Sequence, residues 1–265
     1  GKTYLPRKFK TAIAFPGDNC VDILTNDVGL VALFDEGATE VHGFNIFVGG
    51  GMGATHNDDA TFPRLASPLG YTPLANVVDV VEKIIMVQRD FGDRVERKHA
   101  RMKYLVHEWG DAKFRAKVEE YLGYGLEDFR PMPELGVDDH LGWHQQVDGR
   151  WFYGIYVENG RVRDVGDKRI RSALRALVQD YEPGVIITGQ QNIILSGFTT
   201  EQKQAVEDTL HAYGVPTVEE ISNVRRNAMA CPALPTCGLA LAEAERYLPT
   251  LIDQIEQDVA DLGLS

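Results

Sequence analysis

The stretch "VIITGQQNIILSGFTTEQKQAVEDTLHAYG", residues 185–214, decides the fold of the second half of this 265-residue chain. Two short aliphatic runs, 185–188 and 192–198, are separated by a polar turn and predict two strands. The spacing of apolar residues in 200–214 then predicts an amphipathic helix. Strand, strand and helix in this order make up half of an α+β unit, in which helices cover one face of an antiparallel sheet.

The residues just upstream supply the other half of such a unit. The segment "RWFYGIYVENGRVRDV" (150–165) predicts a hairpin with Asn159 and Gly160 at its turn, because this dipeptide is a strong turn signal. A helix is expected at 169–181. Residues 141–218 are therefore expected to form one β-β-α-β-β-α half-domain.

The first half of the chain predicts a second α+β region, a domain at 1–140. Short apolar runs bounded by turn residues predict strands, and longer runs with capping signals predict helices. The strands are expected at 11–15, 21–24, 29–34 and 43–50, and the helices at 72–92, 97–109 and 112–122. After the half-domain, 219–265 is expected to begin a further domain, with a helix at 239–262.

Composition excludes several classes of protein. The net charge of -12 argues against a nucleic-acid partner, since phosphate binding needs a basic face. No apolar run approaches the ~20 residues that cross a bilayer, and the basic start "GKTYLPRKFK" has no apolar core of a secretory signal. Three cysteines cannot form a disulfide framework, which indicates a reducing cytoplasm.

Two basic clusters stand out in this acidic chain. The segment "RDFGDRVERKHARMK" (89–103) has six Lys or Arg against three acids, and "RKFK" occupies 7–10. Either cluster can be a local anion site or a solvated surface. The glycine-rich "FVGGGMGAT" (47–55) matches a dinucleotide-binding pattern, but no helix is predicted directly after it. Its glycines indicate either a tight irregular turn or a backbone that presses against a flat cofactor or an anion.

The loop "MACPALPTCG" holds Cys231 and Cys237 with five residues between them. Structural zinc sites usually have closer pairs, whereas iron–sulfur clusters accept varied spacings. Two buried thiols are the alternative. Cys20 has no partner nearby in the sequence, and we interpret it as a packing residue.

Six motifs then occur in a fixed order. They are "YLPRKFK", "DNCVDILTND", "GFNIFVGGGMGATH", "QRDFGDRVERKHARMKYL", "TGQQNIIL" and "MACPALPTCGLALAEAERYLP". Together they resemble the siroheme- and [4Fe–4S]-dependent nitrite and sulfite reductase family, above all its assimilatory sulfite reductase hemoproteins. The resemblance implies an α+β siroheme domain followed by a ferredoxin-like half-domain. It also implies a fragment that lacks the family's N-terminal part and second cysteine pair.

The resemblance implies an activity and a set of residues. The enzyme would reduce sulfite to sulfide with six electrons on siroheme coupled to a [4Fe–4S] cluster, and the fragment alone is expected to be inactive. Lys8 and Lys10 match the two active-site lysines, and Cys231 and Cys237 match the first two cluster ligands. The residues expected to bind siroheme are Arg7, Gly49, Gly50, Gly51, Arg101 and Gln191.

Partners and alternatives follow from the same resemblance. The substrate is a small anion, and the electron donor is expected to be ferredoxin or an NADPH-dependent flavoprotein. Nitrite reductases of this family tend to have Asn at the place of Lys10, so this residue favours sulfite. Ferredoxin–nitrite reductase is the first alternative. A non-catalytic siroheme-binding or scaffold protein is the second.

Overall fold

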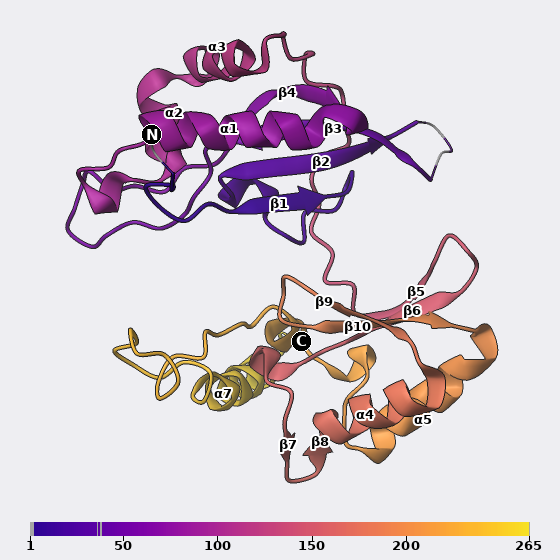
Figure 1. Ribbon diagram of the computed structural model, residues 1–265. Helices are drawn as coiled ribbons and strands as arrows, with labels where there is room; N and C mark the ends of the chain where they lie inside the picture. The colour runs from indigo at the N-terminus through magenta and orange to yellow at the C-terminus, as the bar shows by residue number, and fades with distance from the viewer. Residues whose placement is uncertain (1–2, 36, 38, 265) are drawn as a thin grey trace. The chain divides into compact units, whose positions relative to one another are not determined.

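The computed structural model describes residues 3–35, 37 and 39–264. The chain forms two compact units, Gly1–Asp138 and Asp139–Ser265, each with its own sheet and core (Figure 1). Helices and antiparallel or mixed sheets in both units confirm the predicted α+β class. Within the described residues, no helix has the length and apolar character needed to cross a membrane.

A four-stranded sheet in the order β1-β2-β3-β4 forms the centre of the first unit. Its strands are β1 (Thr11–Ala14), β2 (Val28–Phe34), β3 (Val41–Val48) and β4 (Ser67–Pro73). β1 runs parallel to β2, and the other pairs are antiparallel. Three of the four predicted strands are therefore confirmed in this unit.

Both faces of this sheet are covered. Alternate residues Val28, Leu30 and Ala32 of β2 pack against the helices on one face, as the period of two in a strand requires. The helices are α1 (Val77–Phe91), α2 (Met102–Trp109) and α3 (Asp111–Leu122) (Figure 1). On the other face, Val31 and Phe47 pack with Ile23 and with partly buried residues at 129–135.

Some boundaries in the first unit differ from the prediction. The predicted strand at 21–24 is wrong, since a 3-10 turn, η1 (Ile23–Thr25), follows Asp22 in the left-handed conformation. The Ile23 side chain fills the space beside Gly29 instead. Thr72 and Pro73 belong to β4, so a 3-10 turn, η2 (Leu74–Asn76), precedes α1. The predicted helix at 97–109 is split into η3 (Arg97–His99) and α2.

The second unit has an antiparallel sheet in the order β5-β6-β10-β9. Its strands are β5 (Gly142–Gln145), β6 (Trp151–Ile155), β9 (Gly184–Ile187) and β10 (Ile193–Phe198), with a small β7 (Asp164–Val165) and β8 (Lys168–Arg169) ribbon beside them. The helices α4 (Ile170–Tyr181) and α5 (Lys203–Ala212) pack on one face (Figure 1). The predicted β-β-α-β-β-α order is confirmed, but its first two strands are β5 and β6 rather than the two arms of a hairpin at 150–165.

Two predictions in the second unit are wrong. Asn159 and Gly160 do not close a hairpin, because they form a 3-10 turn, η4 (Glu158–Gly160), and β6 pairs with β5 and β10. The Asn159 amide donates to the carbonyl of Glu245, which ties the turn to a distant loop. The C-terminal helix, α7 (Leu248–Asp261), begins nine residues later than predicted, at a proline in its first turn.

The short elements that complete the second unit are η5 (Thr200–Gln202), η6 (Val218–Glu220) and α6 (Asn223–Arg226). The predicted division into 1–140, 141–218 and 219–265 stays a prediction.

Candidate functional site

The segment before β1 presents two lysines on one side. Lys8 and Lys10 are exposed, whereas Phe9 between them is half-buried and packs on the core. The Lys10 backbone is fixed at both ends, because its N–H donates to Asp27 at 2.8 Å and its carbonyl accepts from Val28 at 3.0 Å. Within the described parts of the chain, the side chains of Arg7, Lys8 and Lys10 make no hydrogen bond or ion pair. Three cations are thus available to an external anion.

Asp27 holds this segment in place, and the sequence analysis did not single it out. Its side chain is fully buried and accepts from Arg101 Nε at 3.1 Å and Nη2 at 2.9 Å. Burial raises the pKa of the Asp27 carboxyl, and the bonds from Arg101 and Lys10 oppose that shift. One carboxylate therefore connects the lysine segment to Arg101.

Arg101 is committed inside the protein. Besides its two bonds to Asp27, Nη2 lies 3.3 Å from the carbonyl oxygen of Gly50, and only 12% of the Arg101 side chain is exposed. The predicted contact between Arg101 and siroheme stays a prediction. The structure gives this guanidinium a second role, which is to join the lysine segment to the glycine-rich loop.

The glycines at 49 and 50 lie against the protein itself. A Cβ on Gly50 would lie 2.2 Å from the Leu24 carbonyl oxygen, and one on Gly49, whose φ is +80°, would lie 2.8 Å from Val106. The nearest neighbours of a Cβ on Gly51 would be the side chains of Arg101, at 3.0 Å, and Lys103, at 3.2 Å. Packing alone explains the first two glycines, and their predicted cofactor contacts remain untested.

Lys103 is a further residue that the sequence analysis missed. It is 1% exposed, and its Nζ donates to the carbonyls of Gly51, Gly53 and Phe62 at 3.2, 2.6 and 2.5 Å. Burial lowers the pKa of this amine. The sequence indicates its burial only weakly, through its position at the start of the amphipathic helix α2. The lysine fixes the path of the glycine-rich loop.

In the second unit, Gln191 lies beside the cysteine loop. Its Nε2 donates to the carbonyl of Ala230 at 3.0 Å, while its buried Oε1 has no hydrogen-bond partner among the described residues. Cys231 is exposed and Cys237 is half-buried, and both are free thiols. The Cys237 N–H donates to the carbonyl of Ala233 at 2.7 Å. The structure thus brings Gln191 and the cysteine loop together.

Cys20 belongs to the first unit and differs from the other two cysteines. Burial and the nearby Asp18 carboxylate raise its pKa to about 11. The Cys20 thiol therefore keeps its proton near neutral pH.

Comparisons with known proteins identify relatives along the whole chain. A family model described as "Nitrite and sulphite reductase 4Fe-4S domain" matches residues 1–125, and one described as "Nitrite/Sulfite reductase ferredoxin-like half domain" matches residues 144–213. The first match includes Cys20 but neither Cys231 nor Cys237. The cysteine loop therefore lies outside both matched segments.

Curated relatives carry sulfite reductase names. A ferredoxin sulfite reductase of Synechococcus elongatus is 47% identical over 261 residues, which cover 98% of this chain and 42% of the relative. An NADPH sulfite reductase hemoprotein beta-component of Geobacillus kaustophilus is 43% identical over 264 residues, which cover 100% of this chain and 46% of the relative. The chain spans about half the length of the curated relatives it matches.

A solved structure has the same fold. The NirA protein of Mycobacterium tuberculosis matches with a TM-score of 0.81 and 31% identity, over 97% of this chain and 45% of that one.

Proposed function

Because the chain belongs to the nitrite and sulfite reductase family, we propose that it is part of an enzyme that reduces sulfite to sulfide with six electrons. The observation that carries the proposal is the agreement along the whole chain with proteins named sulfite reductase, at 47% and 43% identity. The three unpaired cations of the lysine segment support it, since sulfite is an anion.

Lys8 and Lys10 would bind the substrate. Each ε-ammonium has three donors, and a hydrogen bond to a charged group contributes about 1.5–3 kcal/mol. The half-buried Phe9 and the Asp27 carboxylate hold both lysines on one side of the segment. The lysines can therefore neutralise developing charge on an oxyanion and donate protons from Nζ as S–O bonds break.

The family's cofactors would occupy sites on both units. Siroheme and a [4Fe–4S] cluster would supply a Lewis-acidic iron and would relay electrons from the donor. Siroheme carries carboxylates at its rim, and the unpaired Arg7 suits them better than Arg101, which is already bound to Asp27. We propose Gly51 and Gln191 as further contacts. The thiolates of Cys231 and Cys237 would ligate the cluster.

The electron donor and the cellular compartment are also proposals. Relatives are named for ferredoxin and for NADPH, so ferredoxin or an NADPH-dependent flavoprotein is the expected donor. The free thiols are consistent with a reducing cytoplasm. We propose the division into a siroheme domain at 1–140, a ferredoxin-like half-domain at 141–218 and the start of an iron–sulfur domain at 219–265.

The test compares two anions. Reduced viologen dye would be oxidised anaerobically by the whole protein that contains this chain, with sulfite or with nitrite. Lys10→Asn should lower kcat/KM for sulfite by about 100-fold, the scale for a lost charge-stabilising donor, and should spare nitrite. Lys113→Asn is the matched control, since this lysine is exposed on α3. Equal losses for both anions, or none for sulfite, would contradict the role of Lys10.

A further inference from the structure

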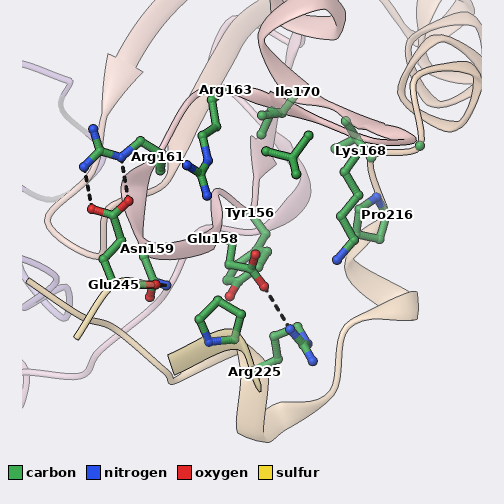
Figure 2. Close-up of a pocket in the computed structure, with 14 residues that line it drawn as sticks. Tyr156, Glu158, Asn159, Arg161, Arg163, Lys168, Ile170, Pro216, Arg225 and Glu245 are labelled. Carbon is green, nitrogen blue, oxygen red and sulfur yellow. Dashed lines mark hydrogen bonds and ion pairs between the residues drawn. The ribbon is translucent and has the colours of Figure 1, made fainter. Parts of the chain in front are cut away.

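The second unit contains a cavity of about 290 Å³ whose lining includes none of the residues proposed above for substrate or cofactors. The η4 turn, the β7–β8 ribbon, the start of α4 and residues 214–216 line it, together with single residues after β6, in α6 and at the start of α7 (Figure 2). Its volume is near the lower end of small-molecule sites. All of its walls come from 156–249, so the cavity exists within one unit.

Two arginines at the cavity wall are neutralised by the protein. Arg161 makes a bidentate pair with Glu245 at 2.6 and 2.5 Å, and Glu245 is buried. Arg225 pairs with Glu158 at 2.9 Å and with two acids of α7. These ion pairs hold the wall together and leave little charge for a ligand.

Two other cations at the wall remain available. Across the described part of the chain, the side chains of Arg163 and Lys168 have no hydrogen bond or ion pair. Figure 2 shows them on opposite sides of the cavity, with Tyr156 between them. Burial raises the pKa of Tyr156 to about 12, so its hydroxyl keeps its proton and can donate. Three donors therefore line the same cavity, in which the Glu158 carboxylate lies beside Tyr156.

Apolar residues make up most of the remaining wall. They are Val165, Ile170, Val215, Pro216 and Pro249, and Asn159 and Gly214 complete the lining. A site with a few convergent polar groups and an otherwise apolar lining is typical of organic ligands rather than of bare inorganic ions.

We propose that this cavity binds a small organic anion, with one carboxylate, phosphate or sulfonate head group on a compact apolar body. The head group lies between Arg163 and Lys168, near the Tyr156 hydroxyl, and the body lies against Ile170, Val215 and the prolines. This site is separate from the lysine segment and does not depend on sulfite reduction.

Calorimetric titration of the 265-residue chain tests the proposal. The probes are phenyl phosphate, benzoate and benzenesulfonate, with inorganic phosphate and benzyl alcohol as references for the head group and the body alone. We expect at least one aromatic anion to bind with a millimolar or lower Kd and both references to bind more weakly. Amide shifts in a ¹H–¹⁵N spectrum should be largest at Val165, Lys168 and Gly214.

The variants decide the role of the two cations. Arg163→Gln and Lys168→Gln should each weaken binding about tenfold, the loss of one hydrogen bond to a charged group. Arg175→Gln is the matched control, because Arg175 is exposed on α4 outside the cavity, and it should leave binding unchanged. No binding by any aromatic anion, equal weakening by the control, or inorganic phosphate binding as tightly as phenyl phosphate would each overturn the proposal.

Discussion

Gly50→Ala distinguishes a glycine required by packing from one required by a cofactor. A Cβ at this position would lie 2.2 Å from the Leu24 carbonyl oxygen and 2.7 Å from that of Asn26, where ordinary contacts begin at 3.4 Å. Both oxygens belong to the backbone, so no side chain can turn away. The β3 end and the η1 turn must separate by about 1 Å.

The loss in free energy of unfolding can be estimated from the contacts that this separation breaks. Overpacking costs about 1–3 kcal/mol, and the Gly50 N–H would lose its 2.9 Å bond to Asn26, about 1 kcal/mol more. We expect the free energy of unfolding of the first unit to fall by about 3 kcal/mol, or Tm by about 10 °C. Gly53→Ala is the matched control, since a Cβ there meets nothing within 4 Å.

Hydrogen exchange measured by mass spectrometry is the assay, because peptides of the second unit serve as an internal reference. Gly50→Ala should reduce protection in β2 and β3 and leave β10 unchanged, and Gly53→Ala should change neither. If Gly50→Ala kept wild-type protection in β2 and β3, the packing argument would be refuted. If Gly50→Ala kept wild-type protection but lost siroheme binding, the cofactor and not packing would require this glycine.

Three further perturbations test the polar contacts. Asp27→Asn leaves Arg101 buried without its anion and should cost about 3–5 kcal/mol in urea unfolding. Lys103→Met keeps the apolar stem but leaves three backbone carbonyls without their hydrogen-bond donor. Amide hydrogen exchange at 51–62 should therefore accelerate. Arg161 holds the pKa of Glu245 below its ordinary value of 4.5. The ion pair between them therefore stabilises the fold above pH 4.5, and this stabilisation is lost as the pH falls through the lowered pKa. In the wild type, the urea concentration at the unfolding midpoint should fall below about pH 4.5, and Glu245→Gln should make this fall smaller. Tryptophan fluorescence follows the unfolding.

The sequence predicted elements whose pattern is local. Short apolar runs at 29–34 and 43–50, bounded by turn residues, identified β2 and β3, and both faces of these strands are buried. The hairpin at Asn159 and Gly160 failed because a distant contact overrode the turn signal. The Asn159 amide bonds to the carbonyl of Glu245, 86 positions away, and Asn192 accepts from the Val157 N–H. Such contacts leave no trace in a local pattern.

In the candidate site too, local features could be predicted from the sequence and long-range contacts could not. Lys8 and Lys10 could be placed on one side because their spacing is that of an extended segment, and the structure has Phe9 on the other side. Asp27 could not be found, since its role depends on Arg101, 74 positions later. A buried carboxylate acquires its function from the cations that reach it in the fold.

Charge density in the sequence is a poor guide to charge that a ligand can use. Five of the six cations in 89–103 have partners inside the protein: Arg89, Arg94, Lys98, Arg101 and Lys103 bond to carboxylates or carbonyls. The shorter cluster at 7–10 has none among the described residues. The dense cluster therefore acts mainly as scaffold, and anion binding is better sought where cations are few but unpaired. The same criterion, applied to the lining of the cavity in the second unit, selects Arg163 and Lys168.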